Sequence, residues 1–187
     1  MDAGSATEFI RMVAVGAIPV IFAITLHEVA HGWMARRYGD RSAEMLGRLS
    51  LNPLHHVDPL GTVLVPLLTL WLGGLMFGWA KPVPINPRAM RNPKQAMVAV
   101  AAAGPAANLL MAIGWAWSLH LAVWLAQWAP VAGDFLGRMA RVGVIFNVLL
   151  GIFNLLPVPP LDGGRVLRGL VPESVGRRLD AIEPYGL

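Results

Sequence analysis

His27, Glu28 and His31 form an HExxH sequence in the C-terminal half of a predicted helix. Side chains at positions i and i+4 project from one face of a helix, so the two imidazoles could bind a single Zn²⁺ ion. Glu28 lies beside them, where its carboxylate could act on a metal-bound water molecule. The pattern alone is only moderately specific, because it also fits the solvated polar face of a soluble helix.

The residues around this sequence favour the zinc interpretation. Residues 12–26, immediately before it, contain no Asp, Glu, Lys or Arg. Two histidines and a glutamate are costly to bury in an apolar helix, and they usually mark a functional site that faces the interior of a helix bundle. The alternatives are a set of hydrogen bonds between helices, or a path for protons or ions.

A catalytic zinc ion needs three protein ligands and one open position. The chain has no cysteine, so the third ligand must be His, Asp or Glu. Met34 and Arg37 occupy the positions at which the metzincin pattern requires Gly and His, which excludes that pattern. The gluzincin arrangement uses a Glu on a following helix, but Glu44 lies in an Arg-rich connection and Glu173 in the C-terminal tail.

Asp162 is the best candidate for the third ligand. It is the only carboxylate near the end of the uncharged run 142–161, and it lies in the sequence PVPPLDGG at residues 157–164. Prolines end a helix, and glycines allow the backbone to approach closely. The alternative is that Asp162 only caps the following helix. A rival group of ligands is formed by His55, His56 and Asp58, although a structural or site-orienting role suits these residues better.

The elements that would position these residues are membrane helices. The chain is 56% hydrophobic and only 14% charged, which is the composition of a membrane protein. Uncharged runs cover residues 12–26, 60–80, 96–133 and 142–161. The last three reach the roughly 20 residues that cross a hydrocarbon core. Helices are predicted at residues 9–37, 93–128 and about 139–156.

Basic residues are concentrated in the segments 36–48, 81–94 and 165–178, next to the apolar runs. Basic residues next to membrane spans account for the net charge of +4. Their placement argues against a nucleic-acid partner. By the positive-inside rule, all three segments should face the cytoplasm.

The ligand positions then restrict the topology. His31 lies near the inner end of the first helix and Asp162 follows the inner end of the last, so an odd number of crossings separates them. The helix at 93–128 is one crossing, and residues 60–78 should therefore not span. We expect an all-α polytopic membrane protein with three core transmembrane helices, a re-entrant or broken segment at about 60–78, and a short extended or β edge segment at about 80–87.

The sequence resembles the site-2 protease family of intramembrane zinc metalloproteases over roughly residues 15–187. The HExxH helix and the segment 154–164, with its Leu-Asp-Gly core, resemble the two defining motifs of that family, in the expected order. The sequence GPAAN at 104–108 is similar to a third family feature, and residues 78–87 resemble the compact bacterial branch without PDZ or CBS domains.

The resemblance implies that His27, His31 and Asp162 bind zinc and that Glu28 is the catalytic acid–base. Members of this branch typically continue into a further hydrophobic helix, whereas this sequence stops at Leu187. We expect residues 1–187 to form a single intramembrane metalloprotease domain that is either truncated before a final transmembrane helix or dispenses with it.

The expected activity is hydrolysis of peptide bonds in membrane-spanning proteins, near the cytoplasmic side of the inner membrane, by a multi-pass enzyme with one catalytic Zn²⁺. Asn108 is predicted to bind substrate by donating a hydrogen bond to its backbone or oxyanion, with a tie between helices as the alternative. A transporter or metal permease that uses the same His, Glu and Asp residues is the alternative function. A scaffold that binds helices without cutting them is a third.

Overall fold

The computed structural model describes residues 3–56, 58–72 and 81–182. Three helices in these residues are long and apolar enough to cross a membrane. They are α1 (Ala3–Arg37), α4 (Pro93–Ala126) and α5 (Pro130–Asn154), and no strand occurs in the described ranges. The prediction of an all-α polytopic membrane protein is therefore confirmed.

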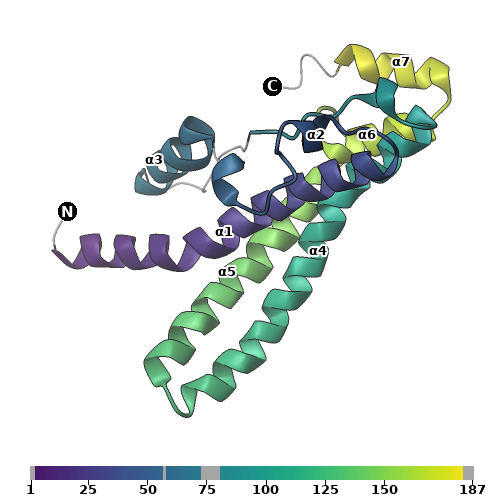
Figure 1. The fold of residues 1–187 in the computed structure, drawn as a ribbon. Helices are drawn as coiled ribbons and strands as arrows, with labels where there is room; N and C mark the ends of the chain where they lie inside the picture. The colour runs from purple at the N-terminus through teal and green to yellow at the C-terminus, as the bar shows by residue number, and fades with distance from the viewer. Residues whose placement is uncertain (1–2, 57, 73–80, 183–187) are drawn as a thin grey trace.

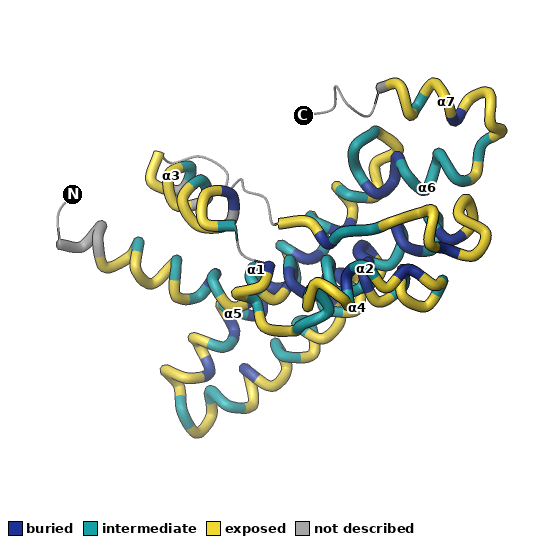
Figure 2. The backbone as a smooth tube through the Cα atoms, turned by 45° about the horizontal axis from the view of Figure 1, so that its top comes forward, coloured by how far each residue is buried: buried dark blue, intermediate teal, exposed yellow. Residues whose placement is uncertain are grey.

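Helices α4 and α5 form an antiparallel hairpin, and the C-terminal half of α1 packs against both (Figure 1). The N-terminal half of α1 diverges from the hairpin and is largely exposed (Figure 2). Gly143 of α5 lies so close to the Trp115 indole of α4 that a Cβ there would overlap the ring. Small residues at such crossings let two membrane helices approach closely.

The predicted start of the last spanning helix was wrong. Helix α5 begins at Pro130 and ends at Asn154, whereas the sequence suggested a helix at about 139–156. Asp134 and Arg138 appeared to interrupt the apolar pattern, but they form an i,i+4 ion pair of 2.8 Å on an exposed face of the helix. Because both charges remain at the surface, the helix continues through them.

The connection after α1 contains short helices only. They are α2 (Ser42–Met45), the 3₁₀-helix η1 (Pro53–His55), the π-helix η2 (Pro59–Leu64) and α3 (Val65–Trp71). Together η2 and α3 are too short to cross a bilayer, which agrees with the prediction that residues 60–78 do not span. Residues 73–78 of that prediction lie outside the described part of the chain.

Residues 81–86 are neither helical nor paired as a strand, and they lead into the 3₁₀-helix η3 (Pro87–Ala89). The prediction of an extended or β edge segment at about 80–87 is met by an extended backbone at Asn86 (φ −114°, ψ 96°) and by no β pairing at residues 81–87, while residue 80 lies outside the described residues. The Lys81 N–H donates to the His56 carbonyl oxygen at 3.2 Å, and the Arg48 guanidinium donates to the Lys81 carbonyl oxygen at 2.6 Å. At the other end, the Asn86 N–H donates to Asp40 Oδ2 at 2.6 Å. The segment is thus held to the connection that follows α1.

The C-terminal tail forms two helices, α6 (Asp162–Leu170) and α7 (Glu173–Ile182). They lie at the end of the α4–α5 hairpin opposite its turn (Figure 1). Arg168 of α6 pairs with Glu173 at 2.7 Å and with Asp180 at 2.8 Å, both on α7.

Candidate metal centre

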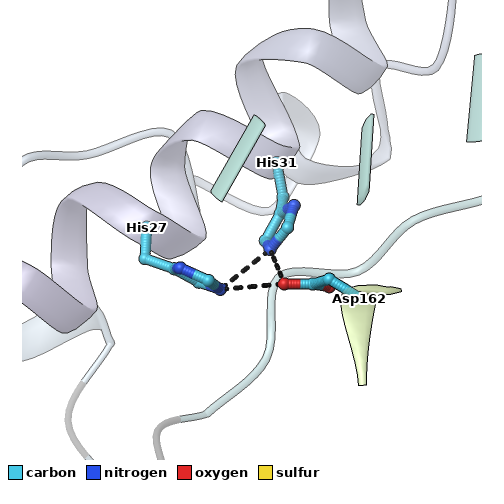
Figure 3. A group of neighbouring side chains, drawn as sticks. All are labelled: His27, His31 and Asp162. Atoms are coloured by element: carbon cyan, nitrogen blue, oxygen red, sulfur yellow. Dashed lines mark hydrogen bonds and ion pairs between the residues drawn. The ribbon is translucent and has the colours of Figure 1, made fainter. Parts of the chain in front are cut away.

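The side chains of His27, His31 and Asp162 converge (Figure 3). The two Nε2 atoms are 3.0 Å apart, and Asp162 Oδ2 lies 3.2 Å from each of them. All three residues are buried. The two histidines come from the C-terminal half of α1 and the aspartate is the first residue of α6.

The position of Asp162 depends on the two glycines that follow it. A Cβ at Gly163 would overlap the backbone of Leu155 and Leu156, and one at Gly164 would lie 2.6 Å from the Pro159 nitrogen. The first turn of α6 therefore packs directly on the backbone that leaves α5. Asp162 is itself the first residue of α6, and its Oδ2 faces the two histidines.

The hydrogen bonds made by the two Nδ1 atoms define the state of both imidazoles. His31 Nδ1 lies 2.7 Å from the Val100 carbonyl oxygen, and His27 Nδ1 lies 2.6 Å from Asn108 Oδ1. Both partners are acceptors, so each Nδ1 carries the proton and donates it. In a neutral imidazole the Nε2 atom then has a free lone pair.

With both imidazoles neutral, three acceptor atoms meet in this buried space. Asp162 Oδ2 is fully buried and has no hydrogen-bond partner, which is costly unless a cation satisfies it. Zinc holds nitrogen and oxygen ligands at about 2.0–2.2 Å in a tetrahedron, which places the ligand atoms about 3.3 Å from one another. The observed separations of 3.0 and 3.2 Å fit such an ion.

Gly104 of α4 provides the space for the two imidazoles. A Cβ at this position would overlap His31 and would lie 2.7 Å from His27 Cε1. Sequence reasoning included Gly104 only as part of the GPAAN resemblance. Its role could not be inferred from spacing, because it depends on how α4 crosses α1.

Glu28 lies between the two histidines in sequence, and its Oε2 accepts a hydrogen bond from the Val83 N–H at 2.8 Å. The extended segment 81–86 therefore contacts the residue predicted to act as acid–base. Nothing in the sequence indicated this contact, because 55 residues separate the two partners.

Asn108 is fully buried, and its amide contacts protein groups on α1 and α5. Oδ1 faces His27, while Nδ2 donates to the Ala23 carbonyl oxygen at 3.2 Å and to Asn147 Oδ1 at 2.9 Å. These contacts tie the helices together, and contact with substrate stays a prediction. Asn147 was not identified from the sequence, where it is one of two asparagines in the uncharged run 142–161.

The rival group of ligands makes local contacts instead of converging. His55 Nδ1 lies 3.1 Å from the Gly47 carbonyl oxygen, and His56 Nε2 lies 2.8 Å from the Ser50 carbonyl oxygen. Asp58 accepts hydrogen bonds from two N–H groups at the start of η2. Within the described ranges, the group of His, Asp and Glu residues close enough to share a metal ion is His27, His31 and Asp162.

Comparisons with known proteins agree with this site. The model of peptidase family M50 matches residues 122–183. YwhC of Bacillus subtilis, provisionally named a zinc metalloprotease, is 39% identical over 170 residues, which are 90% of this chain and 74% of that protein. Rip2 of Mycolicibacterium smegmatis, with the same provisional description, is 32% identical over 166 residues, which are 89% of this chain and 61% of that protein.

A more distant relative is the zinc metalloprotease MJ0392 of Methanocaldococcus jannaschii, which is 24% identical over 163 residues, or 87% of this chain and 36% of that protein. The chain thus spans about three quarters of YwhC and about three fifths of Rip2. No solved structure matches the chain. The chain belongs to peptidase family M50, and it is a zinc metalloprotease with membrane-spanning helices.

Proposed function

We propose that this protein is an intramembrane zinc endopeptidase that cuts membrane-spanning proteins near the cytoplasmic side of the inner membrane. His27, His31 and Asp162 would bind the ion, and Glu28 would act as the acid–base. The observation that carries the proposal is the meeting of three buried acceptor atoms within 3.2 Å of one another, on the inner half of a helix that can span a bilayer.

When bound, zinc supplies a Lewis acid that lowers the pKa of water to about 7 and polarises a carbonyl group. Glu28 takes a proton from the attacking water and returns it to the leaving amine. The Val83 N–H holds one oxygen of this carboxylate in place. With Nδ1 as the donor on His27 and His31, both Nε2 lone pairs would be available to hold the ion.

The place of the site along α1 supports the proposed side of the membrane. His31 lies less than two turns before Arg36 and Arg37, which are the basic residues of the last turn of α1. Basic residues next to a membrane span are enriched on the cytoplasmic side. Water and the products of cleavage therefore need to pass only the inner part of the bilayer.

The substitution Glu28→Gln tests the proposal. Glutamine keeps an oxygen that can accept from the Val83 N–H, but it cannot take up a proton from water. We expect purified wild-type protein to hold one zinc ion per chain and to cleave a single-span substrate. Glu28→Gln should keep the zinc and lose about 10²–10⁴-fold in cleavage rate, the usual contribution of general acid–base catalysis.

Two results would contradict this function. Absence of zinc from purified wild-type protein would contradict the proposed metal site. Full cleavage by Glu28→Gln would contradict the proposed role of Glu28. Metal uptake by proteoliposomes containing Glu28→Gln, with no cleavage by wild type, would support a permease instead.

A further inference from the structure

We propose that Asn147 of α5 is a positioning residue for the zinc site, which acts through Asn108 and His27. This inference rests on the proposed function, because it concerns the first of the three proposed ligands. Asn147 lies on a different helix from either residue, and its side chain hydrogen bonds to Asn108 and to the Gly143 carbonyl oxygen, not to a proposed ligand.

The three side chains form one directed chain of hydrogen bonds. Asn147 Nδ2 donates to the Gly143 carbonyl oxygen at 2.8 Å. Its Oδ1 accepts from Asn108 Nδ2 at 2.9 Å, and Asn108 Oδ1 faces His27 Nδ1 at 2.6 Å. The chain therefore runs from α5 through α4 to the metal-facing imidazole of α1.

Each amide has one orientation that satisfies all its partners. The Gly143 carbonyl can only accept, so the Asn147 amide nitrogen must face it and its oxygen must face Asn108. The Asn108 nitrogen then points to Asn147 and to the Ala23 carbonyl oxygen. Only the Asn108 oxygen is left for His27, which must donate from Nδ1. Asn147 thus helps to define which nitrogen of His27 faces the cation.

Because both amides are buried, the loss of one hydrogen bond in this chain costs free energy. Asn108 and Asn147 are both 0% exposed, so water does not replace a lost partner. A buried amide without its hydrogen bond costs about 1–3 kcal/mol. If the Asn147 acceptor is removed, one N–H of the Asn108 amide loses its partner, and the Ala23 carbonyl alone then holds the amide whose oxygen faces His27. Groups that orient a metal ligand in this way are commonly worth about 10–100-fold in metal affinity.

A matched pair of substitutions separates this role from simple packing. Asn147→Leu keeps the approximate volume and removes the acceptor. Asn147→Asp keeps an oxygen where Asn108 donates; if the buried carboxyl is protonated, it can also donate to the Gly143 carbonyl. Both variants remove the asparagine, but only the leucine variant leaves Asn108 Nδ2 without this partner.

The measurement is the zinc affinity of the full chain in detergent, obtained by competition with a chromogenic chelator. We expect Asn147→Leu, and Asn108→Leu as the direct lesion, to weaken binding by about 10–100-fold. Asn147→Asp should stay within about threefold of wild type. The visible absorption bands of the Co²⁺-loaded protein report ligand geometry, and they should change in the leucine variants but not in Asn147→Asp. Gel filtration and helical circular dichroism establish that each variant is folded.

Wild-type affinity in a folded Asn147→Leu variant would overturn the inference. So would equal weakening in Asn147→Leu and Asn147→Asp, because the acceptor would then not be the cause. If Asn147→Leu does not fold, Asn147→Ser replaces it, because its shorter side chain can bond the i−4 carbonyl but does not extend to Asn108. Absence of zinc from the wild-type protein would contradict the proposed function itself, which is a separate result.

Discussion

The substitution Gly104→Ala should displace the two histidines proposed to bind zinc without altering either of them. The new Cβ would lie 2.6 Å from His31 Cε1 and 2.7 Å from His27 Cε1, whereas carbon atoms in contact are about 3.5–4.0 Å apart. The rings or helix α4 must therefore move by about 1 Å. The rings cannot simply retreat, because each Nδ1 is hydrogen bonded, one to Val100 and one to Asn108.

The expected loss of zinc affinity follows from how little the zinc–ligand distances can vary. Zinc–ligand distances vary by only about 0.2 Å, so a 1 Å displacement is not absorbed. Overpacking of this kind costs about 1–3 kcal/mol, which corresponds to about 5–150-fold in affinity, because about 1.4 kcal/mol is tenfold. We expect the zinc affinity of Gly104→Ala to fall within that range in the chelator competition assay.

Gly114→Ala is the matched control. Gly114 lies on the same helix, and a Cβ there meets nothing within 4 Å. Since alanine favours a helix by about 1 kcal/mol over glycine, this variant should keep wild-type zinc affinity and be at least as stable. A folded Gly104→Ala variant with wild-type affinity would refute the argument that Gly104 provides the space for the imidazoles.

Three further outcomes are expected. Although burial raises the pKa of Asp40, hydrogen bonds from Ser42 and the Asn86 N–H outweigh it and lower that pKa below its usual 3.8. The stabilising contribution of Asp40 is therefore full above about pH 4 and lost as pH falls through the lowered value. The unfolding temperature of Asp40→Asn should consequently fall less than that of wild type as the pH is lowered below about 4. Val83→Pro removes the N–H that holds Glu28 and should lower kcat about tenfold or more with zinc content unchanged, whereas Val83→Ala keeps the N–H and should retain kcat. Removal of the metal by a chelator should abolish cleavage, and Zn²⁺ but not Mg²⁺ should restore it. The reason is that imidazole ligands suit zinc, whereas Mg²⁺ prefers oxygen ligands. Recovery of cleavage with Mg²⁺ would contradict a His-His-Asp site.

Local patterns in the sequence were enough to predict the membrane helices and the candidate ligands. The i,i+4 spacing of His27 and His31 depends only on helix geometry, and Asp162 follows a proline-rich stop that marks the end of an apolar run. The start of α5 was missed because an exposed ion pair between Asp134 and Arg138 resembles a break in the pattern. A charge count does not show that both side chains lie on one outward face.

The supporting contacts of the site could not be predicted for a different reason. Gly104, Val83 and Asn147 act on residues that are distant in sequence, and their roles arise only when α1, α4, α5 and the segment 81–86 are packed together. Asn108 was identified as a polar residue inside a span, but the choice between substrate and helix contacts depends on which groups face it. Those neighbours are set by the crossing of the helices, which residue spacing does not determine.

Helix α6 would supply one of the proposed ligands and α1 the other two, so an ion bound among them would join the first membrane helix to the C-terminal helices. Once the ion is withdrawn, its attraction for these three side chains is lost. Helices α6 and α7 should then loosen and become accessible to added trypsin, which cleaves after Arg165 or Arg177. Scarcity of zinc in a cell would consequently shorten the lifetime of the protein as well as abolish its activity, because zinc binding would be coupled to the folding of α6 and α7.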